Sequence, residues 1–208
     1  CLLRYDAGMA SNRGCSEATR NQRLATIHSL AHFIGMHSPV HVAWCSEIRA
    51  IPFKKTSKSV ICYLEKAEMY ALLDRPDRRT SLGMRDHALL LFLYNSGARA
   101  DEAAKLTIGN LQLGASPSVR LHGKGNKIRI CPLWPTTATS LARLVTDRDR
   151  NDAVFLGRMK EPLTRFGIHR IVTQYAIMAT ESVPTLATKR VSPHTIRHTT
   201  AVHLLRAG

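Results

Sequence analysis

The sequence predicts a mainly α-helical protein with one small antiparallel β-sheet. The spacing of apolar residues leads to this fold class. They recur every three or four positions through most of the chain, as on one face of a helix, and alternate at a spacing of two only around residues 118–133. The predicted helices span residues 17–35, 65–74, 85–94, 100–106, 165–180 and 193–207.

The first helix stands apart from the others in the chain. Leu24, Ile27, Ala31 and Ile34 lie on one face, which leaves Arg20 and Arg23 toward solvent. Ser16 or Thr19 caps its start. The segment 51–58, which is rich in lysine and lacks periodicity, then reads as a linker to a larger second block.

The second block carries clear stop and turn signals. The apolar helix 85–94 must be buried, and Gly97 ends it with a positive φ. Residues 118–133 form a hairpin around Gly123-Lys124-Gly125-Asn126, with 154–156 as a possible third strand.

The last helix has the strongest start signal, because Ser192 is a good N-cap and Pro193 suits the first helical position. We expect Ile196, Thr200 and the pair Leu204 and Leu205 to pack inward from this helix.

Composition points to a polyanionic partner. Thirty Lys and Arg against fifteen Asp and Glu give a formal charge of +15, and the 44% hydrophobic content excludes a disordered polycation. Nucleic acid is the first candidate partner and a membrane surface the second. The longest apolar run, residues 88–94, is far shorter than the roughly 18 residues that span a bilayer. Binding to a membrane surface needs a basic amphipathic helix or a polybasic tail, and neither stands out, so no membrane partner is predicted.

The cysteines and the first residues bear on the compartment. The five cysteines are scattered without a C-x-x-C pair, so neither a zinc ribbon nor a disulfide framework is predicted. The opening CLLRYDAGMA lacks the features of a signal peptide. We therefore expect a cytoplasmic, nucleoid-associated protein with reduced thiols.

The first chemical cluster is Arg99 with Glu102. Arg99 follows the helix-breaking Gly97 and opens the next helix, where it can present its planar fork to two phosphate oxygens. Glu102, one turn on, can hold the guanidinium in place. An ordinary surface Arg–Glu pair is the alternative.

The second cluster is the basic hairpin. Lys124 lies between two glycines at its tip, and residues 119–133 carry four Lys or Arg and no acid. Lys124 can reach into a groove or an active site. An edge strand protected by charge is the alternative.

The third cluster is Pro193-His194-Thr195-Ile196-Arg197-His198. His194 and Arg197 share one helix face and together suit phosphate chemistry. His194, His198 and His203 approximate a metal-binding spacing, but the metalloprotease motif needs Glu where Thr195 stands. We predict no metal.

The order of these clusters resembles the tyrosine recombinase (phage integrase) family, particularly the integrases of transposable elements. The matching segments are residues 94–102 (YNSGARADE), 122–133 (HGKGNKIRICPL) and 192–201 (SPHTIRHTTA). The resemblance implies part of a helical core-binding domain over residues 1–50, the linker 51–58, and an incomplete tyrosine recombinase catalytic domain over 59–208.

The resemblance also implies a chemistry: DNA strand exchange through a phosphotyrosine intermediate, without metal or cofactor. Arg99 and Arg197 brace the scissile phosphate, Lys124 protonates the departing 5′-oxygen, and His194 assists proton transfer. Glu102 supports Arg99. The partners implied are double-stranded DNA and other recombinase protomers. The predicted DNA contacts outside the catalytic set are Arg20, Arg23, Lys127 and Arg129.

One departure from the family bears on activity. The family's nucleophilic tyrosine follows the His-x-x-Arg helix, whereas Tyr5, Tyr63, Tyr70, Tyr94 and Tyr175 all precede it here. We therefore expect a truncated recombinase that binds DNA but does not cleave it alone, or one whose tyrosine comes in trans from a partner. The alternatives are a non-catalytic basic DNA-binding module with a vestigial pocket, a type IB topoisomerase and a zinc hydrolase.

Overall fold

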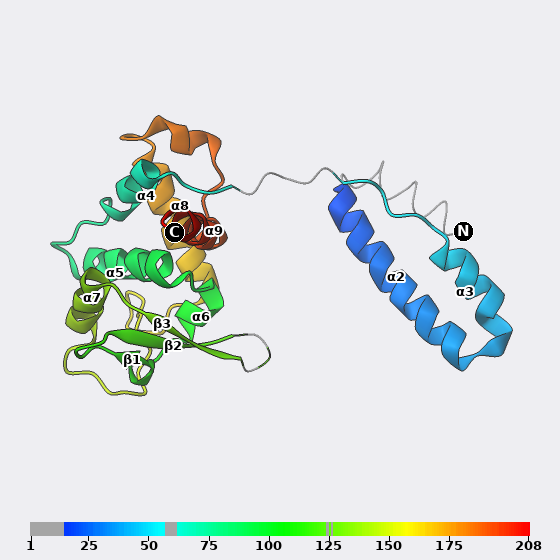
Figure 1. Ribbon diagram of the computed structural model, residues 1–208, viewed down its shortest axis with the longest axis horizontal. Helices are drawn as coiled ribbons and strands as arrows, with labels where there is room; N and C mark the ends of the chain where they lie inside the picture. The colour runs from blue at the N-terminus through cyan, green and yellow to red at the C-terminus, as the bar shows by residue number, and fades with distance from the viewer. Residues whose placement is uncertain (1–14, 57–61, 124, 126) are drawn as a thin grey trace. The chain divides into compact units, whose positions relative to one another are not determined.

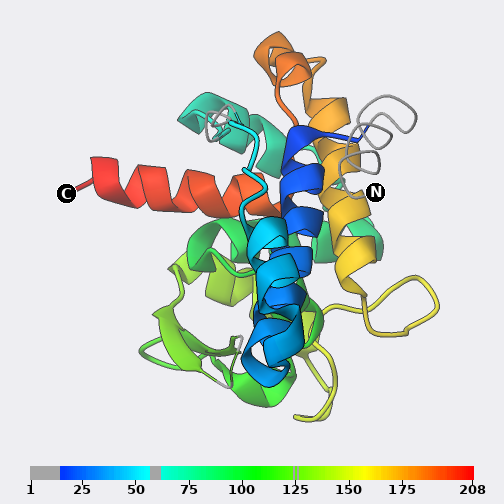
Figure 2. The same cartoon turned by 90° about the vertical axis from the view of Figure 1, so that its right-hand side faces the viewer.

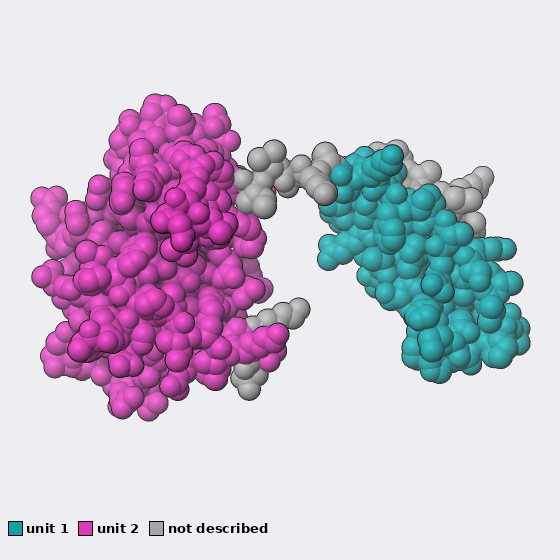
Figure 3. All heavy atoms as spheres, viewed as in Figure 1, with its two compact units in different colours: residues 1–60 teal, residues 61–208 magenta. Residues whose placement is uncertain are grey.

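The computed structural model describes residues 15–56, 62–123, 125 and 127–208. The chain divides into two compact units, residues 1–60 and 61–208 (Figure 3). Each unit has its own buried cluster, and each is considered by itself.

Unit 1 is a pair of helices with a small core. Helix α2 (Glu17–His37) is joined by a 3₁₀ turn, η1 (Pro39–His41), to α3 (Val42–Arg49), which the sequence reading missed. The Ser16 hydroxyl accepts the Thr19 backbone N–H and caps α2. Ala31 packs with Cys45 and Ile48 of α3, so the predicted apolar face of α2 is confirmed.

The prediction that Arg20 points to solvent is wrong. Its side chain is buried, and Nη1 donates hydrogen bonds to the carbonyl of Pro52 and to Asn21 Oδ1. The cause is the segment after α3, which runs back along α2. The Asn21 amide bonds both the carbonyl and the N–H of Lys54, at 2.8 and 3.0 Å. Arg23 is exposed, as predicted.

Unit 2 is mainly helical (Figure 1). Its helices are α4 (Lys66–Leu73), α5 (Ser81–Ser96), α6 (Ala100–Ala104), α7 (Pro135–Val145), α8 (Arg165–Ala179) and α9 (Pro193–Arg206), with 3₁₀ turns η2 (Ile108–Asn110) and η3 (Pro184–Thr188). The sequence reading missed α7. Helix α5 is the central element, buried from Ala88 to Asn95. Each of its buried leucines and its phenylalanine contributes roughly 1.5–3 kcal/mol through loss of apolar surface to water.

The sheet of unit 2 has three antiparallel strands in the order β1 (Leu111–Gln112), β2 (Ser118–His122), β3 (Ile128–Pro132). The predicted hairpin is confirmed. Val119 and Leu121 point into the core while Arg120 faces solvent, as the alternation requires.

The third strand is not at 154–156, as predicted, but at β1. Arginine side chains take several of the carbonyls there: Arg148 bonds those of Ala153 and Val154, and Arg85 bonds that of Leu156. Only isolated bridges form, Thr107 with Ala153 and Leu156 with Pro162.

The predicted end of α5 and the predicted start of α9 are confirmed, but α5 begins at Ser81, four residues before the predicted start, because Thr80 is its N-cap. Gly97 ends α5 with φ of 56°, and Ser192 caps α9. Ile196 and Thr200 are buried, but Leu204 and Leu205 are 61% and 82% exposed, which corrects the prediction that they pack inward. Figure 2 shows the reason, because the last turns of α9 project away from the rest of unit 2.

No helix in the described part of the chain is long and apolar enough to cross a bilayer.

Candidate active site

Arg99 stands between two helices, where the chain turns sharply. Gly97 takes the left-handed conformation that closes α5, and Arg99 is then the extended N-cap residue of α6. Its side chain is 53% exposed. The turn therefore presents the guanidinium at the surface of unit 2.

Glu102, one turn into α6, holds Arg99 as predicted. Its Oε2 accepts the Arg99 backbone N–H at 2.8 Å, and its Oε1 accepts Arg99 Nη1 at 2.9 Å. The carboxylate is buried, with 4% of its side chain exposed. This is a positioned pair and not a loose surface ion pair.

Arg129 completes the surroundings of Glu102. It reaches from β3, and Nη1 and Nη2 donate to Oε1 and Oε2 at 2.9 and 2.8 Å. The sequence reading placed Arg129 among the DNA contacts and did not foresee this pairing. A contact of Arg129 with DNA stays a prediction.

The arginines lower the pKa of Glu102. Burial of the carboxyl raises that pKa, but the hydrogen bonds from Arg129 and from the backbone and side chain of Arg99 outweigh burial and bring it to about 2. Glu102 is therefore ionised at any physiological pH.

Helix α9 brings His194 and Arg197 to the same place. Arg197 is half-buried and donates from Nη1 to the carbonyl of Gly97, two residues before Arg99 in the chain. Burial lowers the pKa of Arg197, and the positive charges of Arg99 and Arg129 lower it further. The guanidinium is thus charged but crowded by like charges, a state that an anion would relieve.

The histidines of α9 do not converge on a metal site. The rings of His194 and His198 lie edge to face, 4.3 Å apart between centroids, whereas His203 is buried and pairs with the Tyr94 hydroxyl at 2.7 Å. Among residues 15–56, 62–123, 125 and 127–208, no three histidine, cysteine or acidic side chains are grouped as a metal would require.

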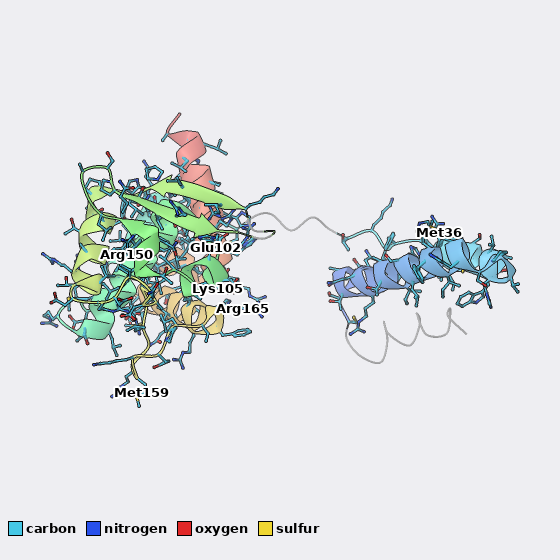
Figure 4. All side chains as sticks on the ribbon, turned by 90° about the horizontal axis from the view of Figure 1, so that it is seen from below. Met36, Glu102, Lys105, Arg150, Met159 and Arg165 are labelled. Carbon is cyan, nitrogen blue, oxygen red and sulfur yellow. The ribbon has the colours of Figure 1, made fainter. Side chains whose placement is uncertain are left out.

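A cleft of about 410 Å³ joins these side chains. It brings together three of the predicted site residues, Arg99, His194 and Arg197. It is also lined by residues that the sequence reading missed, Arg165 and His169 of α8. Figure 4 shows Glu102 and Arg165 toward the same edge of unit 2. The Arg165 guanidinium lies 4.7 Å from the Phe166 ring centre. The one sequence feature that could have indicated Arg165 is its place at the start of α8, directly after the N-cap Thr164.

The remaining predicted residues are placed only in part. Lys124 lies outside the described residues. Lys127 is exposed and directly precedes β3. Gly123, before the turn, donates its N–H to the Lys127 carbonyl at 2.8 Å. The described part of the hairpin therefore closes next to Glu102.

No tyrosine of the described part of the chain lines the cleft. Tyr94 is buried against His203, and Tyr175 donates its hydroxyl to Asp86. Tyr63 lies under the Arg206 guanidinium, 5.1 Å from the ring centre. These tyrosines are packing residues, as predicted for Tyr94 and Tyr175.

The chemistry of the cleft is that of an anion site. Arg99 and Arg129 bind the Glu102 carboxylate and Arg197 lies close enough to feel their charges, so the cluster has an excess positive charge before His194 is counted. Two of them, Arg99 and Arg197, line the cleft. A tetrahedral anion with several oxygens suits this arrangement, because planar guanidinium forks pair with phosphate oxygens.

Comparison with known proteins places the chain. The model of the phage integrase family matches residues 62–208. A putative integrase/recombinase, y4rD, of Sinorhizobium fredii (strain NBRC 101917 / NGR234) is 37% identical over 95% of this chain and 72% of its own length. Tyrosine recombinase XerC of Pelotomaculum thermopropionicum is 31% identical over the whole of this chain and 68% of its own length.

A solved structure agrees in fold. The Tn1549 transposon integrase in complex with circular intermediate DNA matches with a TM-score of 0.72 at 16% identity, over 99% of this chain and 71% of the integrase chain. The sequence motifs, the family model and these relatives converge: the chain belongs to the phage integrase family, the tyrosine recombinases.

Proposed function

We propose that this chain binds double-stranded DNA and holds a backbone phosphate in the cleft of unit 2, as part of a site-specific DNA recombinase or integrase. The observation that carries the proposal is the convergence of Arg99, His194 and Arg197 on one cleft beside a single acid. The relatives named integrase or recombinase, and the integrase solved with DNA, support it.

Each cleft residue has a role in phosphoryl transfer. Arg99 and Arg197 brace the non-bridging oxygens as charge develops on them, and His194 moves a proton at the phosphate. Lys124 protonates the 5′-oxygen that leaves when a tyrosine oxygen bonds to phosphorus. The phosphodiester bond energy is thereby kept in a phosphotyrosine, and the reverse attack by a 5′-hydroxyl rejoins a strand.

Cleavage needs a tyrosine that the described cleft does not contain. We propose that the chain as it stands binds DNA without cutting it, and that a tyrosine brought by another recombinase protomer is what the cleft would use. The second candidate, a non-catalytic DNA-binding module, is favoured by the same observation. Both candidates predict DNA binding and residence at the nucleoid, and they differ in what the cleft does to a phosphate.

The binding test starts from selection. Duplexes with a random central segment are enriched on the chain to obtain a preferred site, and affinity for that site is measured against salt. Arg197→Ala is compared with Arg143→Ala, which removes the same charge from the exposed face of α7. If the cleft holds a phosphate, Arg197→Ala weakens binding roughly tenfold, and Arg143→Ala roughly twofold or less. Equal effects would contradict the proposal.

The cleavage test uses a nicked suicide substrate built on the selected site. The chain alone should give no covalent adduct. It is then mixed with a relative that carries its own tyrosine but an alanine in place of its first active-site arginine. An adduct on that relative supports a competent cleft, and its absence supports the non-catalytic module. An adduct on any tyrosine of this chain would overturn the assignment of those tyrosines to packing.

A further inference from the structure

Four N–H groups saturate the Glu102 carboxylate. Oε1 accepts from Arg99 Nη1 and Arg129 Nη1, and Oε2 accepts from the Arg99 backbone and Arg129 Nη2, all at 2.8–2.9 Å. A carboxylate has about four lone-pair positions. The two arginines share them unequally: Arg129 has the two-point contact and Arg99 a side-chain contact through one nitrogen.

This unequal sharing decides what Arg99 can offer to the cleft. A guanidinium has five N–H donors, and a two-point contact with a carboxylate uses the pair that would otherwise grip two oxygens of a phosphate. Arg129 binds both oxygens of Glu102, so the Arg99 side chain contacts that carboxylate through one nitrogen only. The paired N–H groups of Arg99 are therefore left open, at a residue that lines the cleft and is half exposed.

The position of Arg129 next to Glu102 is set by strand β3. Its Cα pairs with that of Leu121, a fully buried residue of β2. The hairpin closes between Gly123 and Lys127, and a Cβ on Gly123 would lie 3.5 Å from Glu102 Oε1. The arginine therefore approaches Glu102 from a rigid ladder, whereas Arg99 approaches it from a short turn.

We infer that Arg129 is a positioning residue: it binds both oxygens of Glu102 and so keeps the Arg99 guanidinium available to bind a phosphate in the cleft. The inference rests on the proposed function, in which Arg99 binds a phosphate. Without Arg129, Glu102 is a buried carboxylate with two unmet acceptor positions, and the nearest donor that can meet them is the Arg99 guanidinium. Arg99 then folds onto Glu102, and the cleft loses an arginine that is still in the sequence.

The test in DNA binding compares four variants on the selected duplex. Lys127→Gln is the matched control, because it removes one exposed positive charge two residues before Arg129 in the chain. We expect roughly a threefold loss for Lys127→Gln and a loss of roughly tenfold or more for Arg129→Gln. Arg129→Lys restores the charge but not the two-point contact, so it should bind nearly as weakly as Arg129→Gln.

The fourth variant separates positioning from charge. Arg129→Gln combined with Glu102→Gln has the net charge of the wild type and no carboxylate to capture Arg99. We expect its affinity to return to within roughly threefold of the wild type. Arg129→Gln no weaker than Lys127→Gln, Arg129→Lys equal to the wild type, or no recovery in the double variant would each overturn the inference.

A second readout does not need DNA, so it remains informative if the proposed function fails. Nuclear magnetic resonance reports the Glu102 carboxyl carbon against pH and the exchange of the Arg99 guanidinium protons. The wild type should titrate at about 2, with fast exchange at Arg99. Arg129→Gln should raise the titration midpoint and slow the Arg99 exchange, while the double variant restores fast exchange. Unchanged Arg99 exchange in a folded Arg129→Gln would overturn the inference.

Discussion

Two buried acids of unit 2 are paired with arginine, and they differ in charge balance. Asp86 has one arginine: Arg85 donates to Oδ1 through Nε and Nη2 at 2.8 and 2.6 Å, and Tyr175 donates to Oδ2 at 3.0 Å. Both members of that ion pair are about 90% buried. Glu102 is equally buried, but it has Arg99 and Arg129 bound to it and Arg197 close by.

The comparison shows that a buried arginine–carboxylate pair can stabilise the fold or contribute to an anion site, depending on its charge balance. Around Asp86 the charges cancel and the donors and acceptors are met within the protein, so the cluster ties α5 to α8 and to the segment at Leu156. Around Glu102 the positive charge exceeds the negative, and part of it faces a cleft. A balanced buried pair holds the fold together, whereas an unbalanced one is a site for an anion from outside.

The sharpest way to break the comparison is to remove the charge of Asp86. Asp86→Asn leaves Arg85 buried without a counter-charge, and the expected loss in free energy of unfolding is about 3–5 kcal/mol. Urea denaturation measures it. Asp101→Asn is the control, because its partner Lys105 is exposed and the expected loss is at most about 1 kcal/mol. A loss for Asp86→Asn no larger than for Asp101→Asn would contradict a structural role for this pair.

The pH dependence of stability tests Glu102. Its pKa is about 2 in the folded protein, against an ordinary value of 4.5. The lowered pKa means that the charged carboxylate stabilises the fold above pH 4.5, and this contribution is lost as the pH falls from 4.5 toward 2. The shift corresponds to about 3 kcal/mol. Urea denaturation at a series of acidic pH values should show this loss in the wild type.

The matched variant for that titration is Glu102→Gln, which has no carboxyl to protonate. The pKa of Glu68 is also lowered from its ordinary value, despite burial, by hydrogen bonds from Lys189 and Thr185, so Glu68 contributes to the loss of stability in acid as well. The difference between the wild-type and variant curves therefore isolates Glu102. Parallel curves would show that Glu102 is not held by its arginines in solution.

DNA binding tests the part of the Glu102 cluster that faces the cleft, which is Arg99. Arg99→Ala should reduce affinity roughly tenfold and lower the slope of log affinity against log salt by about 1, because one phosphate contact is lost. Its free energy of unfolding should change by less than about 1 kcal/mol, since the side chain is half exposed. The pattern is the reverse of that for Asp86→Asn. An Arg99→Ala variant that lost stability but kept its DNA affinity would mean that Arg99 has a structural role, like the Arg85–Asp86 pair, and does not bind a phosphate.

Local signals in the sequence were sufficient for most elements of unit 2 and for three of the site residues. Gly97 and Ser192 mark helix ends through their own backbone preferences, and the alternation at 118–133 follows from one buried face. Arg99, His194 and Arg197 were found because they stand at fixed offsets from those signals. Such features depend on neighbours in the chain.

What the sequence reading missed depends on partners far apart in the chain. Arg20 is buried by a segment more than thirty residues away, and the carbonyls at 153–156 are taken by arginine side chains. Arg129 looks like any basic hairpin residue until Glu102, 27 positions earlier, lies against it. Spacing along the chain does not contain these pairings, because tertiary packing creates them.

The smallest expected effect concerns Tyr175, which closes the balanced cluster. Burial raises its pKa, the nearby Asp86 raises it further, and the result is about 12. A raised pKa means that the neutral hydroxyl stabilises the fold below pH 10, and this contribution is lost as the pH rises from 10 toward 12. Tyr175→Phe removes the hydrogen bond to Asp86 and should cost about 1 kcal/mol near neutral pH.

Two measurements check this prediction. Burial raises the pKa of Tyr94 as well as that of Tyr175, so the ultraviolet absorbance of phenolate should show both tyrosines ionising late in the alkaline titration of the wild type. Tyr175→Phe should reduce that late absorbance change by the contribution of one tyrosine. Urea denaturation gives the free energy, with Tyr70→Phe as the control, since Tyr70 is 56% exposed on α4. DNA affinity should not change in either variant, because neither tyrosine lines the cleft. A loss of affinity in Tyr175→Phe at unchanged stability would mean that the Asp86 cluster also serves the anion site, and the distinction between the two buried acids would then fail.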